Sequence, residues 1–173
     1  MAIEILEGQD LEGKIWTLNQ LVKFKNWSEP LQQKVLSLIN NQSFYLSERA
    51  IHSFSPELMA QAAFQNQLFE VFLAADYSVQ RLIILKLSKS DFLSDEIKTQ
   101  LAEGLGQYKG PLAQNVLDLF ITHRVSDQLS CLHISELLNN KNRFLARKAC
   151  NYLEQLPIDD RKIRKRMKAY SSK

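Results

Sequence analysis

Apolar residues recur at helical spacing along almost the whole of this chain. In the run 31–39, apolar residues occupy positions i, i+4, i+7 and i+8, which is the pattern of one buried helix face. The run 112–120 repeats this spacing. No stretch alternates convincingly between apolar and polar residues as a half-buried strand does. The sequence therefore predicts an all-α fold.

Start and stop signals divide this pattern into short helices. Ser55-Pro56-Glu57 supplies an N-cap, a proline suited to the first turn and an acid favoured by the helix dipole. Gly110-Pro111 and Leu156-Pro157 each close one segment and open the next. We expect the segment 56–74 to be the most buried helix, because apolar residues occupy more than one of its sides. The predicted helices span roughly 11–24, 29–40, 44–54, 56–74, 77–88, 95–108, 111–123, 127–139, 143–155 and 159–169.

The predicted helices also repeat in pairs. The first helix of each pair carries a polar or basic residue that is followed by small or aliphatic positions. Intervals of 35, 32, 34 and 33 residues separate these register positions. A fixed period in the thirties is typical of a helical-repeat array, in which stacked pairs bury the faces that one pair leaves open. The register residues are Lys14, Arg49, Arg81, Asn115 and Lys148.

Two segments carry a resemblance to a known family. Asp76–Leu82 and Asn142–Ala149 resemble the start of HEAT or HEAT-like repeats, where an Asp or Asn opens the first helix and an Arg precedes a small or apolar residue. Two repeats depart from this pattern, since Asn115 replaces the basic residue in one and Gly13 lies inside the first helix of another. The resemblance covers nearly the whole chain, and the alternative is a non-repetitive helical bundle.

The resemblance implies a fold class and a domain organisation. We expect one α-solenoid domain over residues 1–173, a right-handed α-α superhelix of about five antiparallel helix pairs. A basic capping helix and tail over 159–173 are expected to end it.

Candidate catalytic and metal-binding residues do not combine into a site. Cys131 and His133 are two residues apart in a predicted helix, so their side chains diverge by about 200° and cannot share one ion or act as nucleophile and base. His123 and Cys150 fall within apolar patterns, as packed residues do. The glycines of 104–110 lack the spacing of a phosphate-binding loop. We therefore expect no catalytic residue, no cofactor, no metal and no enzyme activity.

The start of the chain and its hydropathy bear on location. The first ten residues, MAIEILEGQD, are acidic where a signal peptide has a basic flank. The longest apolar runs are far shorter than the roughly 20 residues of a membrane-spanning helix. We expect a cytoplasmic protein without membrane insertion.

The charges of the chain are unevenly distributed. Residues 1–140 carry 11 basic and 16 acidic side chains, whereas residues 141–173 carry 11 basic and 3 acidic ones. Such a basic end attracts phosphates or acidic protein surfaces, although cations near a helix C-terminus can also serve only to cap the fold. The candidate partner-binding residues of this end are Lys141, Arg143, Arg147, Lys148, Arg161, Lys162, Arg164, Lys165, Arg166 and Lys168.

Uncharged amides mark a second candidate surface. In HEAT-type arrays the second helix of each pair lines the concave side, which is the usual partner-binding surface. Amide side chains are frequent in these helices here and can hydrogen-bond to peptides, although an ordinary solvated surface is the alternative for each of them. The candidate residues are Gln61, Gln65, Gln100, Gln107 and Gln128.

These features predict a function of the binding class. We expect a non-enzymatic protein–protein interaction or scaffold module that binds a protein partner on its concave face, with the basic end steering or fastening the partner. The alternative is a nucleic-acid-binding protein whose basic C-terminal end contacts phosphates.

Overall fold

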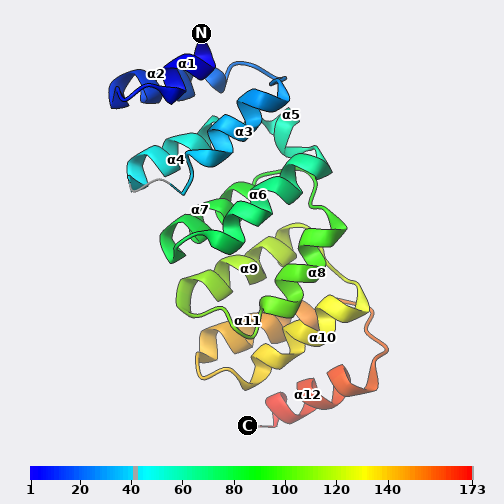
Figure 1. Ribbon diagram of the computed structural model, residues 1–173. Helices are drawn as coiled ribbons and strands as arrows, with labels where there is room; N and C mark the ends of the chain where they lie inside the picture. The colour runs from blue at the N-terminus through cyan, green and yellow to red at the C-terminus, as the bar shows by residue number, and fades with distance from the viewer. Residues whose placement is uncertain (41–42, 173) are drawn as a thin grey trace. The chain divides into compact units, whose positions relative to one another are not determined.

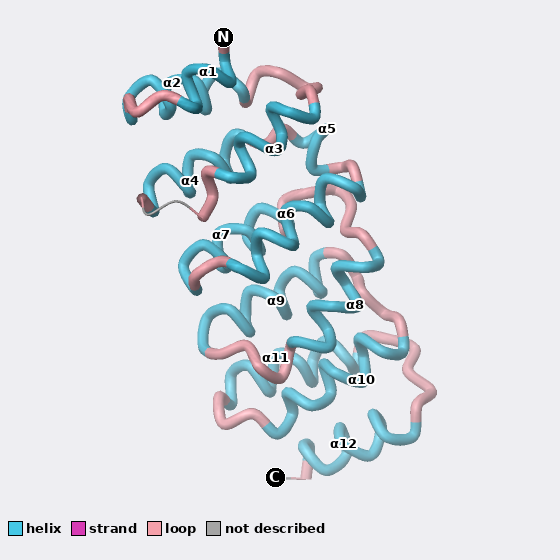
Figure 2. The backbone as a smooth tube through the Cα atoms, viewed as in Figure 1, coloured by secondary structure: helices cyan, strands magenta, loops and turns pink. Residues whose placement is uncertain are grey.

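The structure is a computed structural model that describes residues 1–40 and 43–172 (Figure 1). Within these residues every regular element is helical, and no strand is present (Figure 2). The predicted all-α fold class is confirmed. The predicted C-terminal tail ends at Lys173, which lies outside the described residues.

The helices belong to two compact units, Met1–Ser94 and Asp95–Lys173. The single domain expected over the whole chain stays a prediction. The first unit contains α1 (Ala2–Glu7), α2 (Leu11–Leu21), α3 (Glu29–Ser37), α4 (Phe44–Ser53), α5 (Pro56–Met59), α6 (Ala62–Ala74) and α7 (Tyr77–Leu87). The second unit contains α8 (Asp95–Gly104), α9 (Gly110–Thr122), α10 (Gln128–Glu136), the 3₁₀-helix η1 (Leu137–Asn139), α11 (Arg143–Glu154) and α12 (Arg161–Ser171).

Side-chain caps define where several helices begin. Asp76 Oδ1 accepts hydrogen bonds from the backbone N–H groups of Ser78 and Val79, both at 2.9 Å, at the start of α7. Asn142 does the same at the start of α11, where it accepts from Phe144 and Leu145. These bonds satisfy donors that have no partner inside the helix. Asp76 and Asn142, which open the segments Asp76–Leu82 and Asn142–Ala149, are therefore N-caps.

In the first unit, α4 packs between α2 and α7, and α6 packs on α7. The helices α4 and α7 run in the same direction (Figures 1 and 2). Their C-terminal ends therefore lie together, and Lys86 near the end of α7 contacts the end of α4. Its Nζ donates to the carbonyl oxygen of His52 at 3.3 Å and to that of Phe54 at 2.6 Å. The core of this unit includes the rings of Phe54 and Phe64, whose centroids lie 4.8 Å apart.

In the second unit, α10 packs against α8, α11 and α12, and α9 packs against α11. The buried hydroxyl of Tyr152, near the end of α11, donates to the carbonyl oxygens of Phe120 and Val125 at 3.2 and 2.9 Å. Both carbonyls lie at or just beyond the end of α9, so α9 and α11 also run in the same direction. One pair of parallel helices is thus present in each unit, α4 with α7 and α9 with α11.

The predicted helix 56–74 is wrong in two respects. The structure breaks it into α5 and α6, because the Gln65 amide occupies the carbonyl oxygen of Met59 at 2.6 Å, where a continuous helix would place a backbone N–H. It is also not the most buried helix, since Ala62, Ala63 and Leu73 are exposed and α9 buries six of its residues against five in α6. At the N-terminus, α1 was not predicted, and α2 ends at Leu21 rather than at residue 24.

Candidate partner-binding surface

The apolar stripe of α12 attaches this basic helix to the second unit. Ile163 is fully buried, and Met167 and Tyr170 are half-buried. Helix α12 packs on α10 and η1 through this side. The remaining positions of α12 are left for cations, as the spacing of the stripe predicted.

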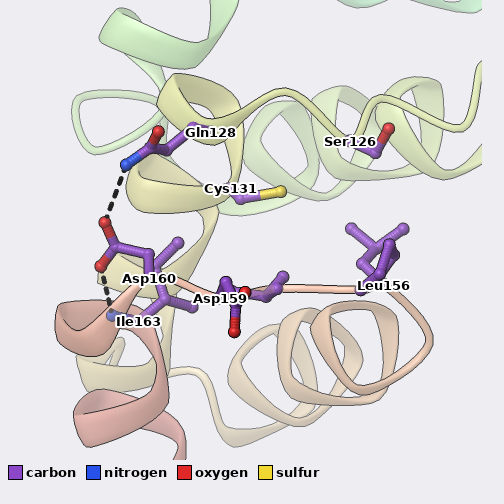
Figure 3. A pocket seen from close by; sticks show the side chains of 9 residues that line it. Ser126, Gln128, Cys131, Leu156, Asp159, Asp160 and Ile163 are labelled. Atoms are coloured by element: carbon purple, nitrogen blue, oxygen red, sulfur yellow. Dashed lines mark hydrogen bonds between the residues drawn. The ribbon is translucent and has the colours of Figure 1, made fainter.

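Asp160 fixes the start of α12. Its carboxylate accepts the backbone N–H groups of Lys162 at 2.7 Å and Ile163 at 3.1 Å, and also the amide of Gln128 at 3.0 Å. Figure 3 shows Asp160 between Gln128 of α10 and the first turn of α12. The hydrogen bond from Ile163, followed by those from Gln128 and Lys162, holds the pKa of Asp160 below its usual range.

Three of the ten predicted basic-end residues hold the fold. Lys148 forms an ion pair with Asp118 of α9. Arg164 donates to Asp159 at 2.7 Å and to the carbonyl oxygen of Ile158 at 2.9 Å. A separate set of bonds secures Arg166, which donates to Ser135 Oγ at 2.8 Å, to the Leu132 carbonyl at 3.2 Å and to Glu136 at 3.5 Å. The sequence pattern did not predict these partners, although most of them lie about 30 residues from their cation, close to one repeat period.

The other seven basic-end residues are exposed, and none forms an ion pair with any part of the chain that the structure describes. We call them the cationic surface. Lys141, Arg143 and Tyr170 line one cleft of about 460 Å³. The start of α11 and the end of α12 therefore contribute to one surface. The cationic surface consists of Lys141, Arg143, Arg147, Arg161, Lys162, Lys165 and Lys168.

A second cavity, of about 400 Å³, is lined by the segment that leads into α12 and by residues in and just before α10 (Figure 3). Its two carboxylates are already engaged, Asp159 by Arg164 and Asp160 by the helix cap. Cys131 also lines it, and burial raises the pKa of this thiol to about 11, with a smaller contribution from Asp127. A thiol with this pKa is protonated at neutral pH and is a poor nucleophile.

The predicted amide residues do not share one role. Gln65 is fully buried and bonds to the backbone of its own unit, so its assignment to a partner-binding face is wrong. Gln100 is half-buried and donates to Glu96 at 3.4 Å. Gln128 is exposed but holds Asp160, while Gln61 and Gln107 are exposed. For these four residues, partner binding stays a prediction.

No group of three or more His, Cys, Asp or Glu side chains in the described residues is arranged to hold a metal ion. Over the same residues, no helix combines the length and the apolar character needed to cross a membrane. Comparison of the chain with protein-family models, with curated proteins and with solved structures finds no match.

Proposed function

We propose that this chain is a protein–protein interaction module of HEAT-repeat type that binds an acidic protein partner. One observation carries the proposal: seven cations of α11, α12 and the turn before α11 are exposed and form no ion pair within residues 1–40 and 43–172, while three others secure the fold. Exposed like charges repel one another unless an anionic surface meets them. The cationic surface is therefore the part of the protein best suited to fasten such a partner.

The helix arrangement supports the solenoid part of the proposal. In each unit one pair of helices is parallel, α4 with α7 and α9 with α11, and the bonds of Lys86 and Tyr152 join their corresponding ends. Stacked antiparallel pairs have this property, because each helix lies beside its counterpart in the next pair. In the proposed superhelix, a protein partner would contact the concave face and the cationic surface together.

A second candidate is binding of nucleic acid by the same cations. One observation favours it: Phe144 is 61 % exposed and lies between Arg143 and Arg147 in the sequence. Aromatic rings beside cations can stack unpaired bases. We favour the protein partner because acids interrupt the basic region, and Asp118 and Glu136 neutralise Lys148 and Arg166.

The test compares two quadruple variants in affinity capture from extracts of the source cells. The first, R161Q/K162Q/K165Q/K168Q, removes four cations from the exposed side of α12. The matched control, K23Q/K25Q/K89Q/K109Q, removes four exposed lysines elsewhere. We expect the wild type and the control to retain one dominant protein after nuclease treatment, and the α12 variant to lose it.

A different result would support the second candidate, binding of nucleic acid by the same cations. If nuclease removes everything that is captured, and oligonucleotides bind with an affinity that falls steeply as salt is raised, phosphates are the target. Equal capture by both variants would exclude the cationic surface from either role.

A further inference from the structure

Two pairs of helices, one in each unit, occupy corresponding positions along the chain. The N-caps of α3 and α6 are Ser28 and Gln61, and those of α10 and α12 are Asp127 and Asp160. The second helix of each pair starts 33 residues after the first, and the second pair follows the first by 99 residues. Each residue of α3 and α6 therefore has a counterpart in α10 and α12.

In the second unit an arginine joins the two helices of its pair. Arg166 of α12 donates to three groups of α10: the Leu132 carbonyl at 3.2 Å, Ser135 Oγ at 2.8 Å and the Glu136 carboxylate at 3.5 Å. The space between these helices is thus occupied by a guanidinium group of the chain itself.

In the first unit the corresponding space is open. Gln67 of α6 takes the position of Arg166, and Gln33, Leu36 and Ser37 of α3 take the positions of its three partners. These four residues of the first unit line a groove of about 360 Å³ between α3 and α6. The shorter glutamine side chain leaves this groove unfilled.

Gln67 offers a buried hydrogen-bond acceptor there. Its Oε1 atom is buried and accepts no hydrogen bond within residues 1–40 and 43–172. A buried acceptor without a donor is unfavourable, so a donor that enters the groove is stabilised. Side chains at the equivalent positions of the other helices all have partners: Lys34 with Glu7, Gln100 with Glu96, His133 with Glu136, and Arg166 with α10.

Glu70 adds a negative charge to the same groove. It lies three residues after Gln67 on α6, so the two side chains share one helix face. Glu70 is exposed and forms no ion pair with the part of the chain that the structure describes. Leu36 and Val71 give the groove an apolar wall. The unit itself is acidic, since residues 1–94 carry 8 basic and 10 acidic side chains, and a cationic ligand is therefore favoured.

We propose that this groove binds an arginine side chain from a basic segment of a protein partner. A guanidinium group has five N–H donors and no acceptor, so it can donate to Gln67 Oε1 and to the Glu70 carboxylate together. Its methylene stem packs on Leu36 and Val71. The bound arginine would take the place that Arg166 occupies in the second unit.

The same groove disfavours a nucleic acid. A phosphate group offers acceptors only, so it would be repelled by Glu70 and would leave the Gln67 acceptor without a donor. This inference concerns the first unit and does not depend on the cationic surface.

The test is an NMR titration of the ¹⁵N-labelled full chain with N-acetyl-arginine N-methylamide, which presents the side chain without terminal charges. We expect saturable shifts at the backbone amides of 33–37 and 67–71 and at the side-chain amide of Gln67. The Kd should lie in the millimolar range, because only one side chain is bound. The citrulline analogue has nearly the same shape but no charge, and it should bind at least about fivefold more weakly.

Three variants assign the binding to the groove. Glu70→Gln removes the charge at an exposed position and should weaken binding at least about threefold. Gln67→Arg supplies a guanidinium from the chain itself, so the ligand should no longer bind. Asp91→Asn is the matched control, because it removes an exposed acid of the same unit outside the groove, and it should bind as the wild type does.

Circular dichroism of each variant verifies that its helices are intact. The proposal is overturned if the arginine ligand causes no saturable shifts in the groove, if the citrulline analogue binds equally well, or if Gln67→Arg binds the ligand as the wild type does. R161Q/K162Q/K165Q/K168Q should leave this binding unchanged, so failure of this inference is distinguishable from failure of the proposed function.

Discussion

The Gln65 side chain accepts a hydrogen bond from the backbone N–H of Ser94 at 2.9 Å, 29 residues further along the chain. Its amide nitrogen donates to the carbonyl oxygens of Met59 and Phe92, both at 2.6 Å. One buried amide thus satisfies three backbone groups, one at the end of α5 and two in the segment after α7. This network ties the C-terminal end of the first unit to its core.

The first prediction concerns this amide. Gln65→Leu keeps the side chain large but leaves three backbone groups without their partner. Each such group costs about 1 kcal/mol or more when it stays buried, so we expect the free energy of unfolding to fall by about 2–4 kcal/mol. Urea denaturation measures this loss. The matched change Gln107→Leu, at an exposed position, should alter the free energy by less than about 0.5 kcal/mol. Equal effects of the two changes would show that the hydrogen bonds of the Gln65 amide do not contribute to the free energy of unfolding.

A second prediction follows from the burial of Lys86. Burial, with a smaller contribution from Lys89, lowers the pKa of Lys86 to about 8, against 10.5 in the unfolded chain. Between these pH values the unfolded state binds more protons, so the contribution of Lys86 to the free energy of unfolding rises with pH. We expect wild-type stability to rise relative to that of Lys86→Met as the pH increases from 7.5 to 10. Urea denaturation at several pH values checks this, and parallel curves would show that the pKa is not lowered.

Helix α12 provides the third prediction. Ile163 is its fully buried contact, and Ile163→Ala should remove about 2–5 kcal/mol from the attachment of this helix. Hydrogen exchange should then show faster amide exchange across 161–171, with little change in α9. Lys165→Ala, at an exposed position of the same helix, is the control and should leave exchange unchanged. Unchanged exchange in both variants would mean that other contacts hold α12.

The fourth prediction concerns the two cysteines. Both are buried, and burial raises the pKa of Cys131 to about 11 and raises that of Cys150 as well. Since the thiolate is the reactive form, we expect both to react slowly with Ellman's reagent at pH 7.5 in the native protein and quickly in urea. Rapid reaction of one thiol in the native state would show that its helix opens locally.

Sequence patterns predicted the local structure well, for identifiable reasons. The caps Asp76 and Asn142, the prolines of first turns and the apolar stripe of α12 act within one or two helical turns, so spacing alone reveals them. The break between α5 and α6 was not predicted. It involves hydrogen bonds from the Gln65 side chain to backbone groups of Met59 and Ser94, and short-range spacing does not reveal such partners.

The same distinction between short-range pattern and tertiary packing applies to the candidate surfaces. The sequence by itself determined that the chain is helical, where its charges are concentrated and that its register residues recur about every 33 positions, because these properties depend on residue type and short-range spacing. Only the tertiary structure decided which charges are free. Asp118 neutralises Lys148 from 30 residues away, whereas Arg49 and Arg81 have no acidic partner in the described residues, and that difference depends on which helices pack together.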